Sequence, residues 1–294
     1  MRNLNDPDFR RSFAERQRLP PDAIPTHLPA LNALMGGDGS QVGLGRGWYV
    51  TLAGLSGSGK SITAINFVVA ALQAGESVAY CSLEMSAEAI ASRYYAVASA
   101  VPVRELERGN FSEGVWKMAA KGVEGLPGLW MPSEISSNWT DLVDFIRAAV
   151  EEKGVGLVVL DYLQLCSLSN SGDESAVFKA IAEITSDLQA YSSNVGVTSL
   201  VLSQFNRQTS SEFRVRPRMS GLWGSAMIEQ ASDCVLLLSH HAYERDDNAG
   251  VARTWIQLEK NRWGKVGDVP ILNSYRDLSQ RCAMPDEIDE WPKP

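Results

Sequence analysis

The sequence predicts an α/β fold in which a mostly parallel central sheet is flanked by helices and carries an antiparallel hairpin at one edge. Short runs of apolar and β-branched residues alternate with helical stretches, which is typical of parallel strands joined by helices. The runs are almost continuously apolar, as strands are when helices cover both faces of a sheet. A chain of 294 residues, 45% hydrophobic and 21% charged, can form one large globular domain with extensions.

The candidate parallel strands cover residues 48–53, 77–83, 157–161, 198–203 and 233–238. Two later runs, residues 254–259 and 269–273, are separated by residues 260–267. A pair of strands joined by so short a connection predicts an antiparallel hairpin, which we place at the edge of the sheet.

We expect three parts along the chain. Residues 1–25 carry arginines and then prolines, which predicts a short basic helix and a stiff linker. That helix either docks on a neighbouring subunit or is a frayed, solvated terminus. Residues 26–275 form the main domain, and residues 276–294 form an acidic tail.

Composition argues against several classes of protein. No window of 18 apolar residues and no apolar stretch after Met1 is present, so we expect a cytoplasmic protein that has no membrane partner. The cysteines are widely spaced, which predicts reduced structural thiols, and they are Cys81, Cys166, Cys234 and Cys282. The three histidines have no cluster of acids or cysteines near them, which disfavours a histidine metal centre and a Ser/His nucleophile. A net charge of −8 argues against coating of nucleic acid by the whole surface but leaves a local basic groove open.

A glycine-rich segment, residues 54–61, follows the first apolar strand and precedes the helical run 62–72. It matches the phosphate-binding loop pattern GxxxxGK[ST] in its required strand-loop-helix context. Its glycines let backbone N–H groups approach a polyphosphate, Lys60 neutralises the β and γ phosphates, and the Ser61 hydroxyl contacts Mg²⁺. The expected nucleotide-binding residues are Gly54, Ser56, Gly57, Ser58, Gly59, Lys60 and Ser61.

Polar side chains follow three other predicted strands, and the carboxyl ends of parallel strands meet at one edge of a sheet. Asp161 ends an apolar strand and is the candidate carboxylate for the metal. Glu84 either polarises a water for attack on the γ-phosphate or serves as a helix N-terminal charge, since Ser86 is a plausible cap for the next helix. Gln204 ends the fourth strand, where its amide can hydrogen-bond the γ-phosphate.

Together these segments resemble one family, the DnaB-type replicative DNA helicases, in their RecA-like motor domain. The resemblance runs from about residue 24 to residue 273. Besides the phosphate-binding loop it rests on Ile24-Pro-Thr26, Ser82-Leu-Glu-Met-Ser86, Val101-Pro-Val-Arg-Glu-Leu-Glu-Arg-Gly109, Leu160-Asp-Tyr-Leu-Gln-Leu165, Leu202-Ser-Gln-Phe-Asn-Arg207, Ile228-Glu-Gln-Ala-Ser-Asp233 and Lys260-Asn-Arg262.

The resemblance implies a RecA-like P-loop NTPase that hydrolyses ATP with Mg²⁺. Glu84 matches the family's catalytic glutamate, Asp161 its metal-coordinating aspartate, and Gln204 its γ-phosphate sensor. Lys260 and Arg262 match a pair that the family inserts into the neighbouring subunit's nucleotide site, where an arginine finger stabilises the transition state. A finger supplied in trans implies a ring, a hexamer by analogy. The implied activity is a DNA helicase that moves 5′ to 3′ on single-stranded DNA, with a helicase loader or a primase as possible partners.

A basic segment follows Gln204 and is expected to line a central channel that grips single-stranded DNA through its phosphates. Its arginines outnumber the single acid, Glu212, and they are Arg207, Arg214, Arg216 and Arg218. The alternative is a solvated loop without a DNA contact. Trp223 stands where the family usually carries an arginine. It either stacks on a base or packs on a neighbouring loop. Alternatively, the binding of DNA is weaker or is shifted to the upstream arginines.

Two other functions compete with a helicase. The first is a RecA-like or KaiC-like ATPase without unwinding activity, or a helicase-derived accessory protein. Trp223 and the short segment before the motor would suit this function. The short segment also means that primase docking cannot be assumed. A compact helicase of a phage or plasmid replication system suits the same features. A metabolic kinase is disfavoured because no acceptor-binding domain is evident and Lys260 and Arg262 would have no role.

Overall fold

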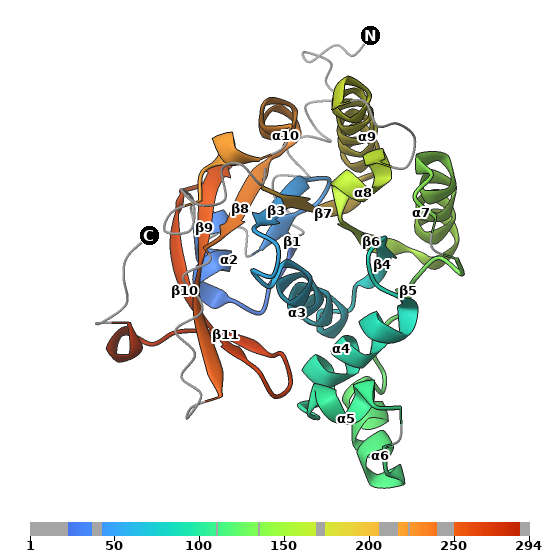
Figure 1. Ribbon diagram of the computed structural model, residues 1–294, viewed down its shortest axis with the longest axis vertical. Helices are drawn as coiled ribbons and strands as arrows, with labels where there is room; N and C mark the ends of the chain where they lie inside the picture. The colour runs from blue at the N-terminus through green and yellow to red at the C-terminus, as the bar shows by residue number, and fades with distance from the viewer. Residues whose placement is uncertain are drawn as a thin grey trace, which may run out of the picture.

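The structure, a computed structural model, describes residues 23–36, 43–109, 111–134, 136–168, 174–205, 217–222, 224–239 and 250–288. Its centre is a nine-stranded sheet with the order β11-β10-β9-β8-β3-β7-β6-β4-β5 (Figure 1). The strands are β3 (Tyr49–Gly54), β4 (Ser77–Ser82), β5 (Leu129–Trp130), β6 (Val155–Asp161), β7 (Thr198–Gln204), β8 (Cys234–Leu238), β9 (Val251–Asn261), β10 (Gly267–Ser274) and β11 (Gln280–Cys282). Strands β5, β4, β6, β7, β3 and β8 are parallel, which confirms the predicted fold class.

Helices cover both faces of the sheet, as Figure 1 shows. They are α2 (Pro29–Met35), α3 (Lys60–Gln73), α4 (Ala87–Ser99), α5 (Val103–Glu107), α6 (Glu113–Gly122), α7 (Trp139–Lys153), α8 (Leu163–Leu168), α9 (Glu174–Val195) and α10 (Ser225–Ala231), with short 3-10 turns η2 (Met219–Gly221) and η4 (Pro285–Glu287). A small separate sheet pairs β1 (Ala23–Ile24) with β2 (Leu44–Gly45). Among the described residues, no helix is long and apolar enough to cross a membrane.

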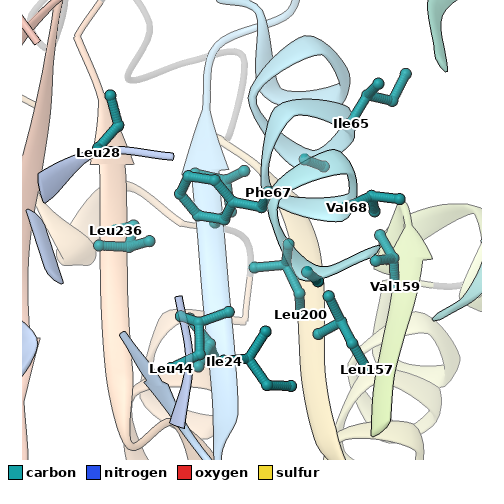
Figure 2. Packing of buried hydrophobic residues seen from close by; sticks show 14 of the residues in the cluster. Ile24, Leu28, Leu44, Ile65, Phe67, Val68, Leu157, Val159, Leu200 and Leu236 are labelled. Atoms are coloured by element: carbon teal, nitrogen blue, oxygen red, sulfur yellow. The ribbon is translucent and has the colours of Figure 1, made fainter. Parts of the chain in front are cut away.

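The two faces of the sheet form two hydrophobic cores. On one face α2, α3 and α4 pack on alternate strand residues, and Figure 2 shows Phe67 and Val68 of α3 in the same core as Val159 of β6 and Leu200 of β7. On the other face α7, α9 and α10 pack on the intervening residues. Leu200 therefore belongs to the first core and its neighbour Val201 to the second. Burial on both faces explains why these strands are almost continuously apolar.

The antiparallel part of the sheet extends further than the sequence indicates. β9 and β10 pair antiparallel, which confirms the hairpin, but β11 pairs with β10 and forms the edge instead. The sheet therefore continues past residue 275, where we expected a tail to begin. Gln280 ties this short strand to the core, because its backbone N–H donates to the Asn66 side chain of α3 and its side-chain amide donates to the Thr63 hydroxyl. The domain boundaries at residues 25 and 275 stay predictions, and residues 1–22 lie outside the described residues.

Candidate functional site

The phosphate-binding loop joins β3 to α3, as the sequence predicts. Gly59 precedes α3 with a φ of 92°, a left-handed conformation that favours glycine. Gly54 allows a close approach: a Cβ there would collide with the Ser58 hydroxyl. The loop therefore turns tightly enough to direct its backbone N–H groups and the amino end of α3 toward one point, where an anionic phosphate is stabilised.

Lys60 lies at the base of this loop and is only 9% exposed. Its Nζ donates to the carbonyl oxygens of Gly54 at 3.0 Å and Leu55 at 2.9 Å, so the ammonium group is held across the loop. Burial lowers the pKa of Lys60 to about 8, while the charges of Asp161 and Glu84 act in the opposite direction. A phosphate group bound in the loop would place an opposite charge beside this buried cation and so stabilise its charged form.

Asp161 ends β6 and is buried. Its Oδ2 accepts a hydrogen bond of 2.7 Å from the hydroxyl of Tyr80, which comes from the neighbouring strand β4. Burial raises the pKa of the Asp161 carboxyl, and hydrogen bonds from Tyr80 and Ser61 oppose that rise. Ser61 and Asp161 thus place a hydroxyl and a carboxylate side by side, an oxygen donor set that fits Mg²⁺.

Glu84 lies in the turn between β4 and α4, and its side chain is exposed. The turn is fixed from both sides: the Leu83 N–H donates to the Asp161 carbonyl at 2.7 Å, and the Ser82 hydroxyl donates to the Met85 carbonyl at 2.7 Å. Ser86 caps α4 by accepting from the Ala89 N–H at 3.3 Å, as expected. The capping of α4 therefore falls to Ser86, which leaves the Glu84 carboxylate available to the pocket.

Gln204 ends β7 and is positioned by a residue that the sequence reasoning missed. Its backbone N–H donates to Oε1 of Gln164 at 3.2 Å, and Gln164 Nε2 donates to the Ser203 hydroxyl at 2.9 Å. Gln164 is buried on α8, just after the strand that carries Asp161. The ends of β6 and β7 are therefore connected through one side chain. The sequence signal for this role was a single polar residue between two leucines, Leu163 and Leu165.

These segments enclose one pocket of about 420 Å³ at the carboxyl edge of the parallel strands. Its lining includes Ser56, Gly57, Gly59, Lys60, Ser61, Glu84, Asp161 and Gln204, together with Ile62, Met85, Arg93 and Tyr162. Most of the predicted nucleotide-site residues thus converge. Arg93 was not predicted, because its place in the pocket depends on how α4 packs. A loop of N–H donors, two cations and an oxygen donor set suit a nucleoside triphosphate with Mg²⁺.

Lys260 and Arg262 lie away from this pocket. Asn261 of β9 pairs with Cys234 at the amino end of β8, whereas Gly54 pairs with Leu238 at the carboxyl end of β8. Four residues at about 3.3 Å each separate those ends by about 13 Å along the strands. The sequence had placed both cations in the hairpin connection, but pairing with β8 extends β9 through Asn261, so Lys260 lies in the strand and Arg262 directly follows it.

Both cations are held locally at the start of β8. The Arg262 guanidinium donates to Asp233 Oδ1 at 3.0 Å and to the Gln230 carbonyl at 3.1 Å. The Lys260 ammonium contacts the Glu229 carbonyl oxygen. The Arg262 side chain is nevertheless 42% exposed, so it is available to a neighbouring molecule.

The predicted DNA-binding segment is described only in part. Arg218 is exposed, next to the short turn η2. Leu222 forms an isolated antiparallel bridge with Phe205, so the chain beyond the segment returns to the end of β7, beside Gln204. The remaining predicted residues, Arg207, Arg214, Arg216 and Trp223, lie outside the described residues.

The sequence model of the DnaB-like helicase C-terminal domain matches residues 23–277. A probable plasmid replicative DNA helicase of Chlamydia psittaci is 29% identical over 249 residues, which cover 83% of this chain and 52% of that protein. The replicative DNA helicase DnaB of Geobacillus stearothermophilus is 28% identical over 266 residues, 88% of this chain and 57% of that protein. The chain thus spans about half the length of these relatives.

Solved structures show the same fold. A chain solved as an isolated ATPase domain superimposes with a TM-score of 0.78 at 19% identity, covering 96% of this chain and 99% of that one. A DnaB-like replicative helicase, solved in a study of its interactions with primase, gives a TM-score of 0.76 at 20% identity and covers 94% of this chain and 68% of that one.

Proposed function

Because the chain belongs to the DnaB-like helicase C-terminal domain family, we propose that it is the motor of a ring-forming, ATP-dependent DNA helicase that moves 5′ to 3′ on single-stranded DNA and unwinds duplex during replication. The observation that supports this most is the convergence of a lysine, two acids and an amide from four separate segments on one pocket. Each of these groups has a part in hydrolysis of a γ-phosphate.

Within the pocket, the loop N–H groups and Lys60 bind the triphosphate, and Ser61 and Asp161 hold Mg²⁺. When bound, Mg²⁺ supplies positive charge that offsets charge on the β and γ phosphates. Glu84 orients the attacking water and accepts its proton, a role for which an exposed carboxylate at the pocket wall is suited. Gln204 hydrogen-bonds the γ-phosphate through its side-chain amide.

Arg262 completes the site of a neighbouring subunit. It lies at the opposite end of the sheet from its own phosphate-binding loop, so it does not serve its own pocket. A subunit packed head to tail would bring this end of one sheet to the pocket of the next, and repeated head-to-tail contacts close into a ring. Lys260 accompanies it as a second cation. A hexamer is the proposed closed form.

DNA contact is coupled to the nucleotide through β7. Gln204 is followed directly by Phe205 and then by the basic segment that carries Arg207, Arg214 and Arg216. A shift of the Gln204 amide on loss of the γ-phosphate would pass along the backbone to that segment. Arg218 and Trp223 complete the proposed contact with single-stranded DNA. A helicase loader or primase is the proposed protein partner.

Forked duplexes with a single tail test this function. The protein is expected to displace the strand when the tail is 5′ and to fail when it is 3′, with Mg²⁺ and ATP required. Lys60→Ala and Glu84→Gln should both abolish displacement, since one removes phosphate binding and the other proton acceptance. Robust ATPase with no displacement from either fork would instead favour a RecA-like ATPase without unwinding activity.

A further inference from the structure

Tyr80 carries a polar hydroxyl into the hydrophobic core. It sits in the middle of β4, fully buried in the hydrophobic core that α3 and α4 cover. Its hydroxyl donates a hydrogen bond of 2.7 Å to Oδ2 of Asp161 on the adjacent strand β6. A phenylalanine would fill the same apolar space, so packing alone does not account for the hydroxyl.

The hydrogen bond determines how the Asp161 carboxylate can act. A carboxylate has about four acceptor positions on its two oxygens, and the bond from Tyr80 takes one of those on Oδ2. The remaining positions are left for groups in the pocket that Asp161 lines with Ser61. The two strands hold donor and acceptor in fixed register, because Tyr80 pairs with Val159 and Ser82 with Asp161. The orientation of the carboxylate is therefore set from inside the core.

We propose that Tyr80 is a positioning residue of the metal site, whose hydroxyl fixes the Asp161 carboxylate and thereby sets the affinity for the divalent cation that accompanies the nucleotide. The inference rests on the proposed function, because it assigns Asp161 to the metal. Groups that hydrogen-bond a metal ligand orient it, and their loss typically weakens metal binding or activity by about 10- to 100-fold.

Tyr80→Phe removes the hydroxyl and keeps the ring, so it tests this role with little change in packing. Mn²⁺ binding in the presence of ADP can be measured by electron paramagnetic resonance, since free Mn²⁺ gives a signal that bound Mn²⁺ loses. We expect Mn²⁺ binding weaker by about 10- to 100-fold in the variant. ADP binding measured with a chelator present should not change, and ATP hydrolysis should recover at high Mg²⁺.

Tyr94→Phe is the matched control. Tyr94 lies in the same hydrophobic core on α4, and its removal deletes a hydroxyl without touching Asp161. Its Mn²⁺ affinity should equal that of the unchanged protein.

Equal Mn²⁺ affinity in Tyr80→Phe and the unchanged protein would overturn the inference, and a lower melting temperature alone would leave Tyr80 with a merely structural role. If the unchanged protein binds no Mn²⁺ with ADP, the proposed function fails first, and the two failures are distinguished by that measurement.

Discussion

Mixing two inactive variants tests whether Arg262 acts on a neighbouring subunit. Arg262→Ala keeps an intact pocket but has no finger, and Lys60→Ala keeps the finger but cannot bind phosphate. In Arg262→Ala alone, turnover should fall by about 10³-fold or more, the usual contribution of an arginine finger. Lys60→Ala alone should be inactive because its loop cannot bind phosphate. Asp233 and Gln230 hold the Arg262 guanidinium at the amino end of β8, about 13 Å along the strands from the end beside the loop, so rescue should come from a neighbouring subunit.

The mixture should recover activity. In a head-to-tail ring of equal proportions, about a quarter of the interfaces join an intact pocket to an intact Arg262. ATP turnover of the mixture should therefore approach a quarter of the rate of the unchanged protein, if each interface works independently. Turnover is followed by phosphate release after the two variants are mixed and allowed to exchange subunits.

Loss of folding would not imitate this result. Arg262→Ala removes an ion pair with Asp233, whose side chain is 8% exposed while that of Arg262 is 42% exposed, so solvent screens part of the attraction. We estimate a loss of about 1 kcal/mol in the free energy of unfolding, small beside the roughly 5–15 kcal/mol of a typical protein. Asp233 keeps the hydrogen bond from the Tyr49 N–H.

Arg281→Ala is the matched control, since Arg281 also pairs with a carboxylate, Glu287, but lies at the far edge of the sheet. It should keep full turnover. A mixture of Arg262→Ala and Lys60→Ala that stays inactive, although both proteins are folded and exchange subunits, would refute the reasoning. So would full activity of Arg262→Ala on its own.

Three further outcomes follow from the described residues. The pKa of Lys60 is about 8, so raising the pH from 7 to 9 removes most of its positive charge. The Kd of a nucleotide analogue should therefore rise by up to about tenfold. A Kd that does not change would contradict the assignment of Lys60 to phosphate binding. A Cβ on Gly122 would lie 2.6 Å from the backbone of α4, so Gly122→Ala should lower the free energy of unfolding by about 1–3 kcal/mol. A Cβ on Gly114 of the same helix would lie 3.8 Å from the Ser112 hydroxyl, an ordinary contact, so Gly114→Ala should raise the free energy of unfolding by up to about 1 kcal/mol. Equal effects of the two substitutions in chemical denaturation would contradict this. Burial raises the pKa of the Cys234 thiol to about 12, so brief alkylation should modify the half-buried Cys282 first. Equal labelling of the two cysteines in peptide mass spectrometry would contradict this expectation.

The fold was largely predictable because its parallel strands are buried on both faces. Such strands are apolar throughout, so their positions and the polar residues at their ends could be found without knowledge of their partners. Glu84 and Gln204 reach the pocket because parallel strands end at one edge. The glycine pattern of residues 54–61 fixed the position of the loop in the same way.

Other features depend on contacts between distant segments. β11 pairs with β10 and is held to α3 by hydrogen bonds from Gln280 to Thr63 and Asn66, which a pattern of three residues cannot reveal. The hydrogen bond from Tyr80 to Asp161 depends on which strand lies beside β6, and the chain order does not give that neighbour. Arg93 enters the pocket through the packing of α4. These positions are decided by the tertiary arrangement of the chain and not by local structural propensity.

The most direct test of the account is ATP turnover per subunit across a dilution series, with and without a single-stranded oligonucleotide. If each subunit completes its neighbour's pocket, turnover per subunit should fall as dilution separates the subunits, and the oligonucleotide should raise it wherever they are assembled. Turnover that stays constant in isolated subunits and does not respond to the oligonucleotide would contradict it.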